Sequence, residues 1–134
     1  MLDWFFSQGF QSFCLVSIGA ITGSVFRFFS LGYLSSVFRY KYLGTLIVNL
    51  VASFFLGLGL SFQFNSAIAS ISVPPIILFF CVGFLGSLST FSAFIIELID
   101  ILLAYKLRQF ILFSLISLFG GLLAVLAGLL LGGV

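Results

Sequence analysis

The segment GFLGSLST, residues 83–90, interrupts an apolar run that extends from about residue 75 to about residue 103. This run is roughly 30 residues long, whereas a helix needs only about 20 apolar residues to cross the hydrocarbon layer of a membrane. Glycine and serine are weak helix formers, so we expect the helix to be broken near residues 86–90. Irregular backbone at membrane depth is tolerated only where protein or water satisfies its polar groups, and the segment is therefore the first candidate for a functional site.

Three further apolar stretches cover about residues 12–29, 44–62 and 110–131. Of the 134 residues, 63% are hydrophobic, only 6% are charged and none is histidine, whereas a soluble domain carries about 25% charged residues. This composition excludes a soluble enzyme, and the net charge of +2 is too small to indicate a nucleic-acid partner. The sequence predicts one all-α integral membrane domain over residues 1–134, with four membrane-spanning helices and a broken third helix.

The basic residues predict the orientation of the chain in the membrane. Arg39 and Lys41 follow the first predicted span, and Lys106 and Arg108 follow the third. The link between the second and third spans and both chain ends contain no lysine or arginine. Because cytoplasmic loops carry an excess of these residues, both basic loops are predicted to be cytoplasmic and both termini to lie outside. We expect a multi-pass protein of the inner (plasma) membrane.

Small and polar residues recur at helical spacing in three of the spans. We expect most of the glycines to permit close packing between helices. Asn49 is a stronger candidate for function, because a side-chain amide has several hydrogen-bonding positions and is costly to bury in lipid. The stripes are formed by Thr45, Asn49, Ser53, Gly57 and Ser61, by Gly19, Gly23 and Arg27, and by Ser114, Ser117, Gly121, Ala124 and Gly128.

Two charged residues and two aromatic rings within the predicted spans are further candidates for function. Arg27 keeps its charge, so it must either extend its side chain to the interface or line a water-filled vestibule. Glu97 follows the predicted break and could either pair with the basic residues after the third span or contribute to a polar mouth. Phe91 and Phe94 lie on one helix face directly after the break. Because the edge of an aromatic ring is electropositive, such rings can attract an anion without a full opposite charge.

This ordered set of motifs resembles the CrcB-type (Fluc) family of fluoride channels. The matching pieces are GAITGSVFR at 19–27, GTLIVN at 44–49 and GFLGSLSTFSAF at 83–94 with Glu97. SLFG at 117–120 is a weaker match. The resemblance implies an antiparallel dimer, in which two subunits of opposite orientation form two fluoride pores along their interface. It also implies fluoride export by passive conduction.

The resemblance also implies roles for individual residues. Asn49 would donate a hydrogen bond in the pore, and Phe91 and Phe94 would contact fluoride with their edges. Arg27 would lie in a vestibule, and Glu97 would lie near the aromatic pair. The remaining implied site residues are Thr90, Ser92 and Ser117, whose hydroxyls would assist in the pore, and Gly86 and Ser89, whose backbone carbonyls would hold a structural sodium ion at the dimer centre.

The charge bias adds a prediction about the partner subunit. A chain that forms an antiparallel homodimer must insert in both orientations, whereas the basic loops of this chain favour one. We therefore expect a paralogue of opposite orientation as the partner, with a homodimer as the alternative. Two other functions stay open: a non-conducting structural subunit of a heterodimeric fluoride channel, and a small proton-coupled exporter with four spans. An exporter of that class carries an acidic residue midway in its first span, where Arg27 is the charged residue here.

Overall fold

The computed structural model describes residues 2–38, 40–67 and 74–133. Within this part of the chain, four helical segments are long and apolar enough to cross a membrane. The predicted all-helical membrane fold is therefore confirmed. Its elements are α1 (Leu2–Val37), α2 (Lys41–Ala67), α3 (Pro75–Ile77), the π-helical segment η1 (Leu78–Leu85), α4 (Gly86–Leu88), α5 (Phe91–Leu103) and α6 (Leu107–Leu131).

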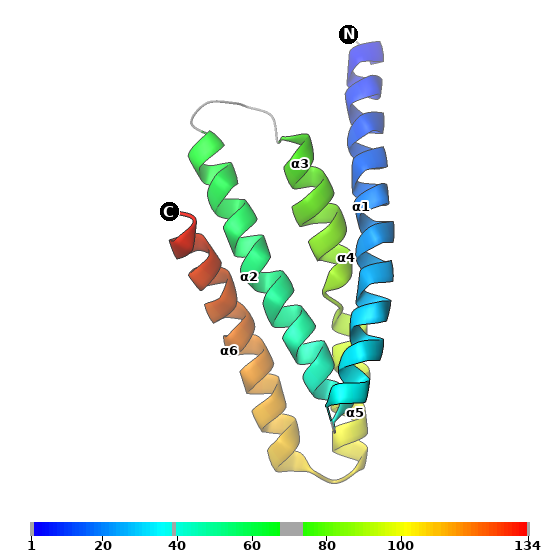
Figure 1. Cartoon of the computed structure of the whole chain (residues 1–134), viewed down its shortest axis with the longest axis vertical. Helices are drawn as coiled ribbons and strands as arrows, with labels where there is room; N and C mark the ends of the chain where they lie inside the picture. The colour runs from blue at the N-terminus through cyan, green and yellow to red at the C-terminus, as the bar shows by residue number, and fades with distance from the viewer. Residues whose placement is uncertain (1, 39, 68–73, 134) are drawn as a thin grey trace.

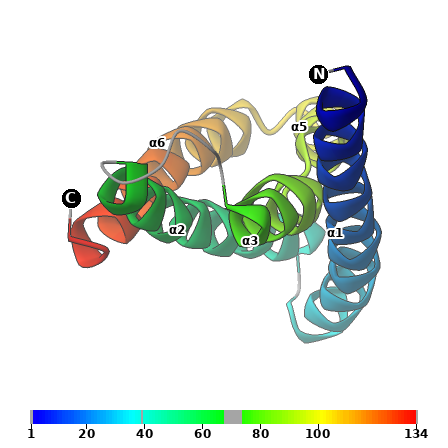
Figure 2. The same cartoon turned by 90° about the horizontal axis from the view of Figure 1, so that it is seen from above.

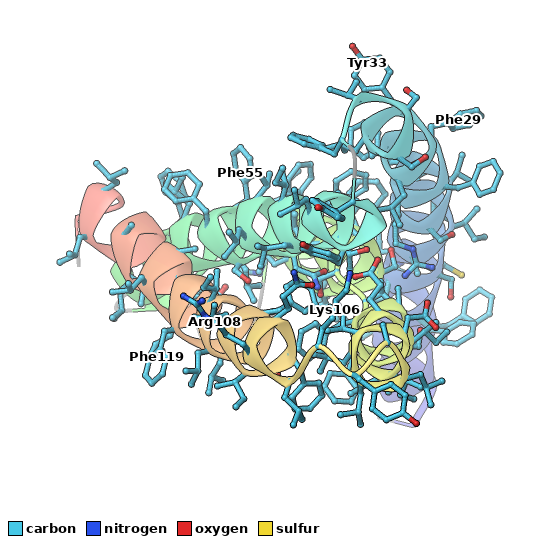
Figure 3. The ribbon with its side chains drawn as sticks, turned by 90° about the horizontal axis from the view of Figure 1, so that it is seen from below. Phe29, Tyr33, Phe55, Lys106, Arg108 and Phe119 are labelled. Carbon is cyan, nitrogen blue, oxygen red and sulfur yellow. The ribbon has the colours of Figure 1, made fainter. Side chains whose placement is uncertain are left out.

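The helices lie across the molecule in the order α6, α2, the α3–α4 segment and α1 (Figure 1). Figure 2, the view from above, shows the same order, with α6 packed along α2 and with α1 packed along η1 and α4. Both ends of the described chain lie toward one end of the bundle, and the α5–α6 connection lies at the other (Figure 1). Lys106 and Arg108 are at this second end, near the start of α6 (Figure 3). Arg39, which belongs to the other predicted basic loop, lies outside the described residues.

The first helix is longer than its apolar composition predicted. The expected span covered about residues 12–29, whereas α1 continues to Val37. Serine hydroxyls in its last turns donate to backbone carbonyls of the same helix, Ser35 to Gly32 at 2.8 Å and Ser36 to Tyr33 at 2.6 Å. These bonds satisfy the polar side chains without ending the helix. Arg27 consequently lies well inside α1 and not near its end.

The third span is broken where the sequence predicted. α4 ends at Leu88, and Ser89 and Thr90 have extended backbone angles (φ −77°, ψ 142° and φ −140°, ψ 123°). Helical geometry resumes at Phe91. The π-helical segment η1 directly before α4 was not predicted. Short π-helical stretches are rare in proteins, and those that occur often lie near functional sites.

Glycines allow α1 to approach η1 and α4 closely. A Cβ atom on Gly19 would meet the carbonyl oxygen of Phe79 and the Cα atom of Gly83. One on Gly23 would meet the carbonyl oxygen of Phe84 and the hydroxyl of Ser87. The predicted packing role of these two glycines is therefore confirmed, because any larger residue would push the helices apart.

Apolar side chains fill the contacts between the helices and cover the outer surface. One buried cluster joins α2 to η1 and α4, and a second joins α5 to α6. The labelled Phe29, Tyr33, Phe55 and Phe119 point away from the helices (Figure 3) and are exposed, as a lipid-facing surface requires. The buried clusters consist of Val48, Ala52, Cys81, Leu85 and Leu88, and of Leu98, Ile101 and Phe113.

The close approach of α1 predicts a position-specific effect of alanine. We expect Gly19→Ala to lower the free energy of unfolding by about 1–3 kcal/mol, because the new methyl group overpacks the contact with η1. Gly32→Ala is the matched control, since it lies in the same helix with open space around its Cβ position. The measurement is denaturant unfolding of both variants in detergent, followed by circular dichroism. Equal stability of the two variants would contradict close packing at Gly19.

Candidate functional site

Asn49 on α2 binds the broken backbone of the third span. Its Oδ1 accepts a hydrogen bond from the Thr90 amide N–H at 3.1 Å, and its Nδ2 lies 3.5 Å from the Thr90 carbonyl oxygen. In an unbroken helix the Thr90 N–H would donate to the Gly86 carbonyl. The side chain of Asn49 therefore replaces the acceptor that the break removes.

This contact also fixes which way the Asn49 amide points. A backbone N–H can only donate, so the oxygen of the side chain must face Thr90. The NH2 group donates one hydrogen to the Thr90 carbonyl at 3.5 Å, and its second hydrogen stays available as a donor. Asn49 thus presents a neutral hydrogen-bond donor beside the break.

A groove with a volume of about 630 Å³ opens next to Asn49. Most of the pore residues expected from the sequence line it together, although α2, α5 and α6 contribute them from distant parts of the chain. Ser92 does not line the groove, but its hydroxyl lies 3.0 Å from the hydroxyl of Thr90, which does line it. The lining residues that bear on function are Asn49, Ser53, Ser89, Thr90, Phe91, Phe94, Ser114 and Ser117.

The two aromatic rings of the groove differ in exposure. The ring centroids of Phe91 and Phe94 lie 6.1 Å apart, and their planes are tilted by 42°. Phe94 also packs at 5.4 Å against Phe113, which is buried and holds it in place. Phe91 is 75% exposed. One wall of the groove is therefore open in the single chain.

Serine hydroxyls supply further polar groups, and among Ser53, Ser114 and Ser117 only Ser117 was expected in the pore from the resemblance. Ser53 lies one helical turn beyond Asn49, and Ser114 lies one turn before Ser117. The hydroxyl of Ser114 donates to the Phe110 carbonyl at 2.9 Å. Ser53 and Ser117 make no hydrogen bond to the described residues, which leaves their hydroxyl protons for the groove. The four-residue spacing from Asn49 was the signal that could have identified Ser53.

Arg27 and Glu97 line a second groove, with a volume of about 870 Å³, on the other side of α5. Thr45 of α2 donates to Glu97 Oε1 at 2.5 Å, and Oε2 of Glu97 is buried without a hydrogen-bond partner in the described chain. Arg27 Nη1 donates to the Ser87 carbonyl at 3.0 Å. Glu97 therefore shares a groove with Arg27 and not with the aromatic pair, and among the described residues it forms no ion pair with Lys106 or Arg108.

The carbonyl groups of Gly86 and Ser89 are both released by the break. The N–H that would bind Gly86 is taken by Asn49, and Ser89 is extended, outside both helices. Such carbonyls suit a hard cation such as sodium, which prefers oxygen ligands. The chemistry of the backbone at this point thus fits the cation that the resemblance implies.

Comparison with known proteins places this geometry in a family. The model of the family described as CrcB-like protein, Camphor Resistance (CrcB), matches residues 14–129 of the chain. The chain is 42% identical over 114 residues to the fluoride-specific ion channel FluC 1 of Prochlorococcus marinus (strain MIT 9313), an alignment that covers 85% of this chain and 86% of that protein. It is 37% identical over 125 residues to FluC of Thermosipho melanesiensis, covering 91% and 96%. It is 36% identical over 121 residues to FluC of Acinetobacter baylyi, covering 90% and 93%.

The bond between Asn49 and Thr90 predicts how two substitutions will differ. Asn49→Leu removes the acceptor and should speed hydrogen exchange of the Thr90 amide by about tenfold or more, because a lost buried hydrogen bond costs roughly 1–3 kcal/mol. Asn49→Asp keeps an acceptor oxygen and should preserve the protection. Exchange is measured by NMR on the protein in micelles, with Ser53→Ala as the control one turn away. Equal exchange in the leucine and aspartate variants would rule out the assigned orientation.

Proposed function

Because this chain belongs to the CrcB-like family, we propose that it is a fluoride-selective ion channel that exports fluoride by passive conduction. The observation that carries the proposal is the groove beside the break, where the NH2 group of Asn49, two serine hydroxyls and two aromatic rings converge. These groups are neutral or weakly electropositive. They come from three helices and face one space.

Fluoride is small and holds its water tightly, so a pore must replace the lost hydration with many donors. Asn49, Ser53 and Ser117 offer N–H and O–H groups, and the edges of Phe91 and Phe94 offer positive potential. None of the residues that line the groove, all in the described part of the chain, is charged. A fixed cation would bind the anion too firmly for release, whereas weak, repeated contacts allow it to move on.

The second groove would serve as a vestibule. Arg27 carries a permanent positive charge there, and its charge attracts anions toward the protein. Thr45 and Glu97 add polar groups to the same space. Fluoride would enter this hydrated space before it loses its water at the aromatic pair.

We place the second wall of the pore on a second subunit in an antiparallel dimer. Phe91 is largely exposed in the single chain, although a pore must shield its ion from lipid. A subunit inserted in the opposite orientation would cover this ring, and the two-fold symmetry of such a pair would produce two equivalent pores.

A structural sodium ion at the dimer centre would be held by the backbone carbonyls of Gly86 and Ser89 from both subunits. The fit rests on the release of both carbonyls by the break. When bound, the ion would neutralise the partial negative charge of these oxygens in a low-dielectric region. The chain itself keeps them available, because Asn49 takes the amide that would otherwise bind Gly86.

The predicted orientation of the chain supports a heterodimer with an oppositely oriented paralogue, and a homodimer is the alternative. Lys106 and Arg108 lie at the end of the bundle opposite to both termini (Figures 1 and 3), which agrees with cytoplasmic basic loops and external termini. A chain with this bias inserts in one orientation, so its antiparallel partner would be a different chain.

Fluoride flux tests the channel. We expect proteoliposomes with the assembled protein to release fluoride without a pH gradient, and Asn49→Asp and Phe91→Ile to slow release by about 10- to 100-fold, since each loses roughly 1.5–3 kcal/mol of contact with the ion. Phe119→Ile is the control, because this ring is exposed on α6 away from the groove. A fluoride electrode measures the release.

Each alternative outcome identifies a different function. Equal rates in the wild-type protein and both groove variants would remove the pore assignment and favour a non-conducting structural subunit. Release only when a proton gradient is imposed would favour a coupled exporter.

Expression of the chain by itself tests the partner. With reporter tags on both termini, we expect one orientation and no fluoride release, and we expect release only when an oppositely biased paralogue is co-expressed. Lys106→Gln combined with Arg108→Gln should produce a mixture of orientations, because it removes two of the basic residues that set the bias. Equal amounts of both orientations in the unmodified chain, together with fluoride release, would contradict the need for a paralogue.

A further inference from the structure

The break in the third span is held from two sides by side chains of two other helices. Arg27 of α1 donates to the Ser87 carbonyl, before the break, at 3.0 Å. Asn49 of α2 binds the Thr90 backbone, after the break. Asn49 belongs to the proposed pore, whereas the contact of Arg27 with Ser87 has no place in a vestibule that only attracts anions.

The partner of Arg27 is a carbonyl that the break leaves without its helical donor. In a continuous helix Ser87 would accept from the N–H of Phe91, but Phe91 is the first residue of α5. The last carbonyls of a helix carry a partial negative charge, and a cationic side chain at that end stabilises them. A half-buried guanidinium supplies both the donor and the charge in a low-dielectric site.

The stripe of Gly19, Gly23 and Arg27 brings the guanidinium to this carbonyl. Gly19 lies against Phe79 and Gly83, and Gly23 lies against Phe84 and Ser87, each without room for a Cβ atom. Arg27 lies one turn after Gly23 on α1, at the same four-residue spacing, and its guanidinium reaches the Ser87 carbonyl. The glycines therefore set the distance and the register at which Arg27 reaches the end of α4.

We propose that Arg27 is a positioning residue that caps α4 and holds the break open. It binds the Ser87 carbonyl, so that the neighbouring Gly86 and Ser89 carbonyls keep their orientation. The cap itself depends only on the observed contacts. Its use, to present carbonyls to a cation, rests on the proposed function.

Three variants separate a cap from a vestibule charge. Arg27→Met removes both the charge and the donors, Arg27→Lys keeps the charge and a smaller set of donors, and Arg108→Met removes an arginine at the charged end of the bundle, away from the break. Two measurements are made on the assembled channel in liposomes: hydrogen exchange of the amides of residues 88–91 by mass spectrometry, and fluoride release at low and high ionic strength.

If Arg27 caps α4, Arg27→Met should speed exchange at residues 88–91 by about tenfold, and the slower fluoride release should persist at high salt. Arg27→Lys should restore part of the protection, and Arg108→Met should leave exchange unchanged. Unchanged exchange in Arg27→Met would overturn the proposal. It would also be overturned if Arg27→Met released fluoride more slowly than the wild type at low salt but at the same rate at high salt, where the charges are screened. Both results would indicate that Arg27 acts only as a vestibule charge.

Two further controls keep the test decisive. If Arg27→Met does not assemble, Arg27→Lys is compared with Arg108→Lys, and faster exchange only in the former is expected, since lysine lacks the planar set of guanidinium donors. Equal exchange in these two lysine variants would overturn the cap. Absence of fluoride release from the wild-type channel would contradict the proposed function, while the exchange measurement would still decide the role of Arg27.

Discussion

Backbone groups released inside a membrane have no water to bind, and this constraint governs the arrangement of the whole chain. The third span leaves helical geometry at Ser89 and Thr90. Side chains from both neighbouring helices satisfy two of the groups that are freed, the Ser87 carbonyl and the Thr90 N–H. α1 contributes a guanidinium and α2 contributes an amide. Close packing at Gly19 and Gly23 and the apolar cluster between α2 and α4 bring these groups to one short segment.

The same constraint explains why the proposed pore lies beside the break and not along a regular helix. A continuous helix uses all its N–H and C=O groups internally and offers an ion nothing but side chains. At the break, Thr90 brings a hydroxyl and engages Asn49, and Phe91 and Phe94 begin a new helix at that point. The proposed site for a small anion thus consists of neutral groups that the broken backbone positions.

Hydropathy and residue spacing were sufficient to predict the four helices and the break, and they singled out Asn49, Phe91 and Phe94 as candidates. Thr90 and Ser117 were expected only from the family resemblance. The length of α1 was not predicted, because hydropathy reports which residues prefer lipid and not where a helix ends. The groove that Glu97 lines depends on which helices pack against each face of α5, and spacing along α5 does not encode that packing. Ser53 was identified as part of a stripe, but a small polar residue serves packing and ion contact equally well.

The fixed orientation of the Asn49 amide limits which residues this position accepts over evolution. The side chain has to offer an acceptor to the Thr90 N–H and a neutral donor to the groove at the same reach. Aspartate lacks the donor, leucine lacks both groups, serine is shorter and glutamine is longer by one methylene. None of these four substitutions provides both groups at the same reach. A homologous chain that keeps both the bond to Thr90 and the donor in the groove is therefore expected to retain asparagine at this position.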